Sequence, residues 1–344
     1  MGIFDLIAGG YETVSYAHDE DTGLRCIIAI YSTALGPALG GTRFWPFESE
    51  DAALLDVLRL AKAMAYKASA AGLDLGGGKA VVIGDPRASK TPELLRAYGR
   101  AVERLGGAYV TTADVGTTST DMNVIAEATR FVTGTSAGSG DPSPVTAYGV
   151  WHGIKAVAEE IWGDTSLAGR HVAVQGVGKV GSDVARHLAA EGAQLTLADI
   201  DRTAAETLAS ELGADLVSPE EIAAVPCDIF SPCALGAVVN DDSLPGFKCR
   251  AIAGAANNQL ERPDHGDALT DAGILYAPDY VINAGGLINV EDELHGYDSA
   301  RAHAKAKLIG DRLGSVFARA KAEGTTTAAA ADAIAEERIR NASR

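Results

Sequence analysis

The stretch from residue 171 to residue 201 constrains the fold more than any other part of the sequence. It has the pattern of a strand ("HVAVQ"), a glycine-rich turn ("GVGKVG"), an amphipathic helix ("SDVARHLAAEGA") and a second strand ("QLTLADID"). Two strands joined by a crossover helix of this length form one unit of a parallel sheet. The sequence therefore predicts an α/β fold that contains an open parallel sheet.

The three glycines of the turn stand at the spacing that a dinucleotide-binding turn requires. Gly176 permits the tight turn, Gly178 lets the backbone approach a pyrophosphate, and Gly181 lets the helix pack on the strand. The helix that follows presents unpaired N–H groups to the phosphates. We therefore predict a Rossmann domain. Its predicted phosphate-binding residues are Gly176, Val177, Gly178, Lys179, Val180 and Gly181.

Asp199 ends the second strand, 23 residues after Gly176. A carboxylate at this position accepts hydrogen bonds from the ribose hydroxyls of NAD and repels a 2′-phosphate. NAD is therefore the predicted cofactor. Arg202 lies close by in the sequence and keeps NADP open, and a strand–turn–helix without any ligand is the remaining alternative.

The first 135 or so residues alternate strands and helices. Residues 11–18 and 23–33 have strand patterns, and residues 49–72 have apolar residues at helical spacing, with Ser49 as the N-cap. Further along, "KAVVIGDP" is predicted as a buried strand, "TPELLRAYGRAVERLGG" as a helix and "AYVTTADVG" as a strand. This alternation predicts a second α/β domain before the dinucleotide-binding one.

The segment "GTSAGSGDPSPVTAYG", residues 134–149, is rich in glycine, serine and proline and is typical of an interdomain connection. We predict domains over residues 1–140 and 146–318, with a helical segment over 319–344. Later strand-like pieces ("CDIFSPC", "CRAIAGAANN", "GILYAPDYVINAGG") each end in polar or small residues, as at the ligand-facing edge of a parallel sheet.

Charge and cysteine usage exclude several classes of function. With 29 basic and 46 acidic residues the net charge is −17, which disfavours a nucleic-acid partner. No apolar run reaches 18 residues, so no membrane span is predicted, and "MGIFDLIAGG" lacks the features of a signal peptide. A cytoplasmic location is therefore expected. No cysteine pair has CxxC spacing and the seven histidines do not cluster along the sequence, so no metal site is predicted.

The stretch "LDLGGGKAVVIGDP" places Gly76, Gly77 and Gly78 directly before Lys79. It lacks the glycine spacing and the Ser/Thr of a P-loop, so the glycines are interpreted as a hairpin-tight approach beside the lysine. A solvated loop lysine is the plain alternative.

Three ionisable residues stand next to apolar neighbours, which argues against that alternative. Lys67 lies near the end of the helix predicted over 49–72, Lys79 precedes an apolar strand, and Asp114 ends the strand "AYVTTAD". Burial and a neighbouring cation both lower the pKa of a lysine, which makes it a usable base near neutral pH. A second lysine that stays charged would bind a carboxylate.

Several motifs together resemble the Glu/Leu/Phe/Val dehydrogenase family. These are "GPALGGTRF", "MAYKASAAGLDLGGGKAVVIGDP", "TADVGTT", "VQGVGKVG", "PCALGAVV", "GAANNQL" and "YAPDYVINAGGLINV". The resemblance covers nearly the whole chain and is strongest to the branch that acts on branched-chain amino acids. It implies reversible NAD-dependent oxidative deamination of an L-amino acid to a 2-oxo acid and ammonium.

The resemblance also implies roles for the matching residues of the first domain. Lys67 would bind the substrate carboxylate, Lys79 would activate the attacking water, and Asp114 would move protons to and from the amine. Gly40 and Gly41 would let the backbone approach the substrate. The active site would lie in the cleft between the domains.

For the second domain, the resemblance places Thr146 and Asn258 near the nicotinamide carboxamide or ribose, and Asn283 in the same cleft. It implies a homo-oligomer formed through the first domain. By its own pattern "AIAEERIRN" would be a solvated helix, and only the resemblance implies that the 319–344 segment returns to the first domain.

Two residues bear on the substrate side chain. Leu39 stands where the glutamate enzymes of the family carry a lysine, so a distal carboxylate would lack a partner. Leu287 stands where smaller residues are usual in leucine and phenylalanine enzymes and would narrow the pocket. The prediction is a preference for valine, then leucine and isoleucine. A phenylalanine dehydrogenase and a non-catalytic NAD-binding sensor are the alternatives.

Overall fold

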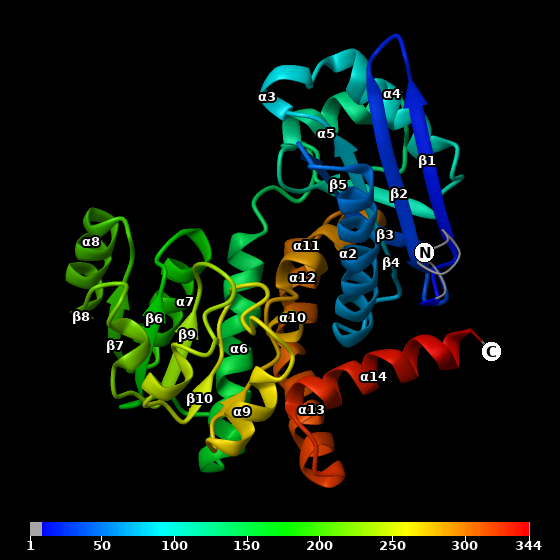
Figure 1. Cartoon of the computed structure of the whole chain (residues 1–344). Coiled ribbons are helices and arrows are strands. Elements are labelled where there is room, and N and C mark those ends of the chain that lie inside the picture. The colour runs from blue at the N-terminus through cyan, green and yellow to red at the C-terminus, as the bar shows by residue number, and fades with distance from the viewer. Residues whose placement is uncertain (1–8, 344) are drawn as a thin grey trace. The chain divides into compact units, whose positions relative to one another are not determined.

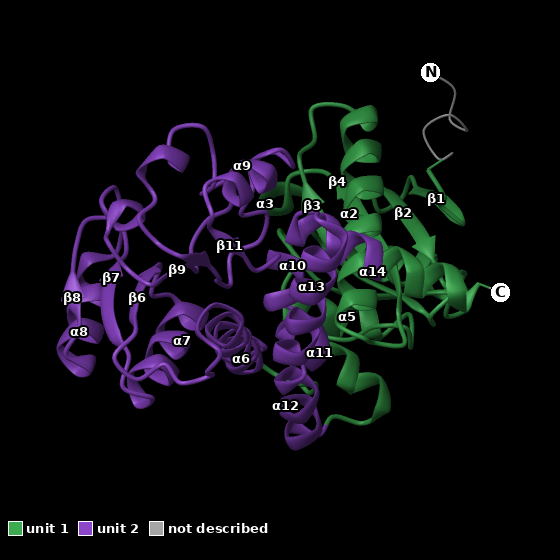
Figure 2. Ribbon diagram, turned by 90° about the horizontal axis from the view of Figure 1, so that it is seen from below, with its two compact units in different colours: residues 1–140, 290–297, 335–344 green, residues 141–289, 298–334 purple. Residues whose placement is uncertain are grey.

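The computed structural model describes residues 9–343, and most of "MGIFDLIAGG" lies outside them. The chain forms two compact units (Figures 1 and 2). Unit 1 comprises Met1–Gly140, Val290–Tyr297 and Ala335–Arg344, and unit 2 comprises Asp141–Asn289 and Asp298–Ile334. Both contain a sheet covered by helices, which confirms the predicted two-domain α/β fold. Among the described residues, no helix has the length and apolar character that crossing a membrane requires.

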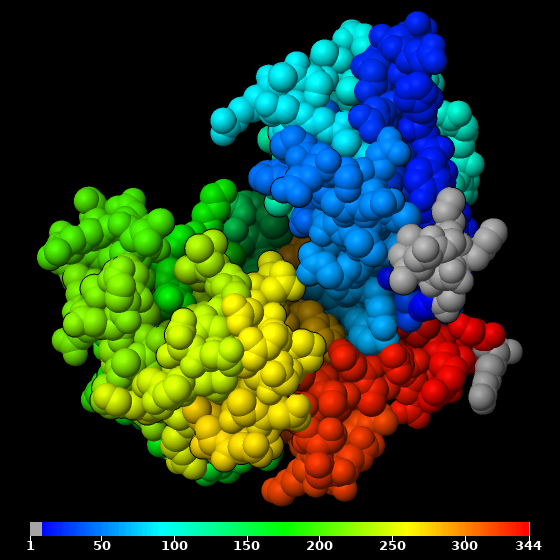
Figure 3. Space-filling model, viewed as in Figure 1, coloured from blue at the N-terminus to red at the C-terminus, as the bar shows by residue number. Residues whose placement is uncertain are grey.

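Unit 1 is built on a five-stranded sheet in the order β1-β2-β4-β3-β5. The strands are β1 (Thr13–Asp19), β2 (Leu24–Ser32), β3 (Ala38–Trp45), β4 (Gly76–Ile83) and β5 (Tyr109–Ala113). The central strands β4 and β3 run parallel, as do β3 and β5, whereas β2 is antiparallel to both β1 and β4. Strands β1 and β5 are the outer strands of this order, and β1 lies at the surface in dark blue in Figure 3.

Helices cover both faces of this sheet. They are α2 (Glu50–Ala70), α3 (Pro86–Ser89), α4 (Pro92–Glu103) and α5 (Ser119–Ala126). Alternate residues of β2 point to opposite faces. Ile27 and Ala29 pack with α2, whereas Cys26 and Ile28 pack with α4 and α5. The predicted N-cap of α2 is confirmed, because the Ser49 side chain accepts a hydrogen bond from the Ala52 N–H.

Two features of the sheet differ from the sequence prediction. Strand β3 was not predicted as a strand, because its glycines, Gly40 and Gly41, disfavour strands when judged locally. The predicted hairpin-tight approach at the triple glycine was wrong: Gly76, Gly77 and Gly78 are the first residues of β4, and their strand lies between β2 and β3. The backbone of Ser32, the backbone and side chain of Ala65 and the ring of Tyr109 fill the space that larger side chains would need.

Unit 2 is built on a six-stranded parallel sheet in the order β11-β10-β9-β6-β7-β8. Its strands are β6 (His171–Gln175), β7 (Gln194–Ala198), β8 (Asp215–Leu216), β9 (Ile229–Pro232), β10 (Ala251–Ile252) and β11 (Leu275–Tyr276). The strand order reverses between β6 and β9. Ligands of open parallel sheets bind at such a reversal, beyond the carboxyl ends of the strands.

The helices of the remaining chain surround this sheet or connect the units. They are α6 (Ser143–Trp162), α7 (Lys179–Ala190), α8 (Arg202–Leu212), α9 (His265–Asp271), α10 (Asp279–Ile282), α11 (Gly285–Asp292), α12 (Ser299–Lys307), α13 (Ile309–Glu323) and α14 (Thr327–Ala342). Short 3-10 turns occupy Ile222–Ala224, Leu244–Gly246 and Glu293–His295. Helix α7 begins three residues before the predicted helix, because the last residues of the glycine-rich turn form its first turn.

The chain passes from unit 1 to unit 2 between Gly140 and Asp141, within the segment predicted as a connection. Glu293 holds this segment on the unit 1 side. Its carboxylate accepts hydrogen bonds from the N–H groups of Gly134 and Ser139, each over 2.9 Å. The connection therefore has fixed contacts up to the crossing point.

The last part of α14 belongs to unit 1 and is not simply a solvated helix. Arg338 donates to the Leu73 carbonyl over 2.7 Å and pairs with Asp74 over 2.9 Å. Glu336 accepts a hydrogen bond from the Tyr66 hydroxyl. The polar residues of "AIAEERIRN" thus bind the end of α2, which periodicity alone does not indicate.

Candidate active site

The glycine-rich turn of unit 2 has the features of a phosphate site. Gly176 has a φ of +92°, and a Cβ there would lie 2.7 Å from the Cβ of Ala234, so only glycine suits the turn. A Cβ on Gly181 would overlap the Gly176 carbonyl oxygen. By contrast, a Cβ on Gly178 would meet no atom within 4 Å, so the space beside the start of α7 is open. No side chain caps that helix, which leaves its N–H groups for an anion.

Asp199 lies directly beyond β7, next to this turn. Its Oδ2 accepts from the Val177 N–H over 2.6 Å and its Oδ1 from the Asp201 N–H over 2.8 Å. A cavity of about 210 Å³ adjoins it, lined in part by Gly176, Ile200 and Leu235. The side chains of Ile200 and Leu235 are 93% and 82% exposed, which is costly for apolar groups unless a ligand covers them. The residues present suit the adenosine part of a dinucleotide.

The remaining predicted cofactor residues are placed by α6, α10 and the loop after β10. Thr146 lies in the first turns of α6, where its hydroxyl donates to the Pro142 carbonyl. Asn258 has a φ of +51°, which is rare for a residue other than glycine. Asn283 is buried, and its amide donates to the Asn257 side chain over 2.8 Å. The pairing with Asn257 was not predicted, because no local pattern indicates it.

Lys179, the fourth residue of the turn, forms an exposed ion pair with Asp141 over 2.8 Å. Val180 follows it in the first turn of α7. Leu287, predicted to contact the substrate side chain, lies on α11 and is buried. The structure thus places these three residues on the helices α7 and α11.

In unit 1 the structure brings Lys79 and Asp114 together. The Nζ of Lys79 lies 2.6 Å from Asp114 Oδ2. Lys79 is buried in the middle of β4, whereas Asp114 follows the end of β5 and keeps 22% of its side chain exposed. A Cβ on Gly41 would lie 2.7 Å from the Cβ of Asp114 and 3.3 Å from Lys79 Nζ. Glycine at this position therefore preserves the space beside the pair.

Burial and charge act against each other at this pair. Burial lowers the pKa of Lys79, and the nearby Asp114 offsets that effect only in part. Burial tends to raise the pKa of Asp114, but the ammonium of Lys79, the Val115 N–H and the guanidinium of Arg43 together outweigh it, so this pKa lies below its ordinary value. The arrangement joins an ionised carboxylate to a lysine that releases its proton more readily than usual.

The other predicted residues of unit 1 surround the same part of the sheet. Leu39 of β3 pairs with Gly77 of β4 and shares the face of the sheet that carries Lys79. Lys67 lies in the last turn of α2, the helix that covers this face. A Cβ on Gly40 would overlap the Gly78 carbonyl oxygen, and the Gly40 carbonyl accepts from the Tyr109 hydroxyl.

Comparison with known proteins identifies the family. Residues 12–131 match the family model described as Glu/Leu/Phe/Val dehydrogenase, dimerisation domain. Residues 137–205 and 196–343 match the model described as Glutamate/Leucine/Phenylalanine/Valine dehydrogenase. The chain belongs to the Glu/Leu/Phe/Val dehydrogenase family. It is therefore an amino acid dehydrogenase, an oxidoreductase of a family that uses a nicotinamide cofactor.

Individual members of the Glu/Leu/Phe/Val dehydrogenase family are closely similar along nearly the whole chain. A leucine dehydrogenase from Bacillus cereus is 54% identical over 332 residues, which are 96% of this chain and 91% of the relative. A valine dehydrogenase from Streptomyces coelicolor is 49% identical over 347 residues, covering 99% and 95%. The crystal structure of L-tryptophan dehydrogenase from Nostoc punctiforme superposes with a TM-score of 0.93 at 45% identity, covering 99% of both chains.

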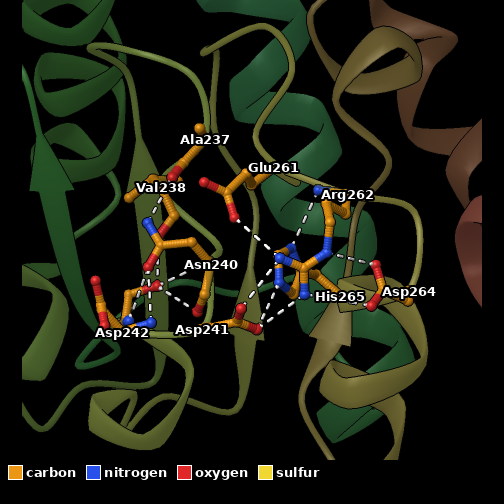
Figure 4. Close-up of polar contacts among 10 residues, drawn as sticks. Ala237, Val238, Asn240, Asp241, Asp242, Glu261, Arg262, Asp264 and His265 are labelled. Carbon is orange, nitrogen blue, oxygen red and sulfur yellow. Dashed lines mark hydrogen bonds and ion pairs between the residues drawn. The ribbon is translucent and has the colours of Figure 1, made fainter.

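One histidine lies beside carboxylates that its spacing along the sequence does not indicate. His265 is buried, and one ligand atom from each of Asp241, Glu261 and His265 lies within 4.8 Å of the others. Arg262 already pairs with Asp241, Glu261 and Asp264 (Figure 4). Both ring nitrogens of His265 have partners, the Arg262 N–H and Asp241, each at 3.1 Å. The cluster is thus an ion-pair network around a guanidinium, and we assign it no metal.

Proposed function

We propose that this protein catalyses the reversible NAD-dependent oxidative deamination of short branched aliphatic L-amino acids to 2-oxo acids and ammonium. The observation that carries the proposal is the Lys79–Asp114 ion pair beside Gly41. The names of the leucine and valine dehydrogenase relatives support the substrate class. A non-catalytic NAD-binding sensor would have no use for a buried lysine whose pKa is lowered.

The proposed cofactor site consists of the glycine-rich turn, the start of α7 and Asp199. A nicotinamide cofactor held by these residues would supply the hydride acceptor for the substrate α-carbon. Lys67, with its charge retained, would bind the substrate carboxylate. Asp114 would accept a proton from the substrate amine before the hydride leaves and return it to the departing ammonia.

Lys79 would act on the second half of the reaction. Once the α-carbon is oxidised and the C–N bond has become an iminium, water must add to that carbon. The neutral amine of Lys79 would take a proton from this water, and a lowered pKa makes that neutral form easier to reach. The carbinolamine then breaks its C–N bond as Asp114 protonates the nitrogen, and its hydroxyl proton passes to solvent as the C=O double bond forms. The products are the 2-oxo acid and ammonia, which takes up a proton in solution.

A panel of amino acids tests the substrate class. We expect kcat/KM, measured from the increase in NADH absorbance, to be highest for L-valine and slightly lower for L-isoleucine and L-leucine. For L-phenylalanine and L-tryptophan it should be at least about tenfold lower. The physical reason is that Leu39 is buried on the face of the unit 1 sheet that carries Lys79 and leaves less room there for an aromatic side chain than a smaller residue would.

Two outcomes of this panel would contradict the proposal. An aromatic amino acid as the best substrate would point to the activity for which the Nostoc punctiforme relative is named. A chain that binds NAD but forms no NADH with any amino acid would be a sensor.

Cofactor preference depends on Asp199. Asp199→Asn should raise the ratio of kcat/KM with NADP to that with NAD by about tenfold or more, because removing a like charge favours the 2′-phosphate. Asparagine keeps an oxygen that can accept from the Val177 N–H, so the turn is preserved. The matched control is Arg202→Gln, since Arg202 points away to Glu206 over 2.7 Å and is exposed. An unchanged ratio in Asp199→Asn would remove Asp199 from cofactor selection.

A further inference from the structure

A second cation reaches the oxygen of Asp114 that Lys79 contacts. Arg43, on β3, places its Nε 3.5 Å from Asp114 Oδ2, while Lys79 Nζ lies 2.6 Å from the same atom. Asp114 Oδ2 and Arg43 Nε are both buried and have no hydrogen-bond partner of regular geometry, so the contacts of Oδ2 with the two cations are ion pairs. Both cations therefore lie against the same oxygen of Asp114.

Arg43 is itself held by a carboxylate on α2. Its Nη1 lies 2.7 Å from Oδ2 of Asp56, and these two side chains are only 23% and 16% exposed. The other oxygen of Asp56 contacts Arg59 over 3.0 Å, at the surface. Removing two charges from water is costly, and a partly buried ion pair is weak evidence for stability alone.

We propose that Arg43 and Asp56 are positioning residues for the acid–base pair of the active site. Arg43 holds Asp114 Oδ2 toward Lys79. Asp56 holds Arg43 in place and offsets its charge. The proposal rests on the proposed function, because it assigns the pair a role through Asp114 and Lys79. Neither Arg43 nor Asp56 need touch the substrate.

The two residues act on Lys79 with opposite sign. The positive charge of Arg43 lowers the pKa of Lys79, whereas the negative charge of Asp56 raises it. Arg43 also lowers the pKa of Asp114. The charged groups that act on the pair are Arg43 from β3 and Asp56 from α2, besides the two members themselves from β4 and the end of β5. Loss of Arg43 should therefore shift the titration of Lys79 upward, and loss of Asp56 should shift it downward.

Competitive acetylation measures this titration without requiring turnover. Acetic anhydride reacts with neutral amines, so the pH dependence of Lys79 acetylation, read by mass spectrometry of its peptide, reports the pKa of that side chain. We expect the midpoint to rise by roughly one pH unit in Arg43→Gln and to fall by a similar amount in Asp56→Asn. Arg59→Gln, 64% exposed at its side chain, is the matched control and should leave the midpoint unchanged.

The pH profile of kcat/KM for the best amino acid substrate then connects the pair to the reaction. The apparent pKa values that this profile reports should move in the same directions as the acetylation midpoints. The variant Arg43→Lys keeps the positive charge and should restore the profile in part. Shifts of the same sign in Arg43→Gln and Asp56→Asn, or no shift in folded variants, would overturn the proposal. Shifted midpoints with an unmoved profile would also overturn it. If the unmodified chain oxidises no amino acid, the proposed function fails, while the acetylation midpoints still decide whether the pair controls Lys79.

Discussion

Replacing Lys79 by alanine should lower kcat for amino acid oxidation by roughly 10²–10⁴-fold, the usual contribution of a general base. The side chain is buried in β4 and its Nζ pairs with Asp114, so the variant lacks the amine that the proposed mechanism uses as its base. NAD affinity should change little, because the cofactor residues proposed here belong to unit 2. Steady-state kinetics and a calorimetric titration with NAD measure the two quantities separately.

Two additional measurements make this result specific. Lys62→Ala is the matched control, since Lys62 also belongs to unit 1 but lies exposed on α2, over the ring of Tyr66. It should keep nearly full activity. A small primary amine such as ethylamine should restore part of the lost kcat in Lys79→Ala by occupying the vacated space. Near-normal turnover in Lys79→Ala without added amine would remove this residue from the mechanism.

Replacing Gly77 by alanine should destabilise unit 1 by about 3 kcal/mol or more, at the upper end of overpacking effects. A Cβ at this position would overlap the backbone N and Cα and the side chain of Ala65 on α2. Neither β4, hydrogen-bonded between β2 and β3, nor a helix of 21 residues can move aside at low cost. Because α2 carries Lys67 in its last turn, the displacement should also raise KM for the amino acid.

Scanning calorimetry tests this expectation. Gly77→Ala should lower the first melting transition by about 6 °C or more. Gly314→Ala is the matched control: it lies in α13, and a Cβ there meets nothing within 4 Å. That variant should be neutral or stabilised by up to about 1 kcal/mol, because alanine favours a helix over glycine. A Gly77→Ala protein with the same melting temperature as the unmodified chain would show that α2 does not pack against β4 as closely as described.

Much of the fold and part of the candidate site follow from local sequence. The unit from β6 to β7 is predictable because each glycine of the turn and Asp199 serve short-range geometry, which spacing along the chain records. The helix capped by Ser49 is predictable for the same reason. By contrast, β3 was missed because Gly40 and Gly41 argue against a strand, and only the neighbouring strands explain them.

The sequence by itself determined the α/β class, the dinucleotide-binding unit and, through the resemblance to the family, the candidate residues Lys67, Lys79 and Asp114. The fold class and the dinucleotide-binding unit depend on patterns within about 30 residues, and the three candidate residues depend on motifs shared with the family. Only the tertiary structure decided that Lys79 pairs with Asp114 and that Arg43 contacts Asp114 and pairs with Asp56. It also decided that the triple glycine begins a strand. The physical reason is that contacts across strands β3, β4 and β5, between residues far apart in the chain, place these charges together, and no local pattern encodes that register.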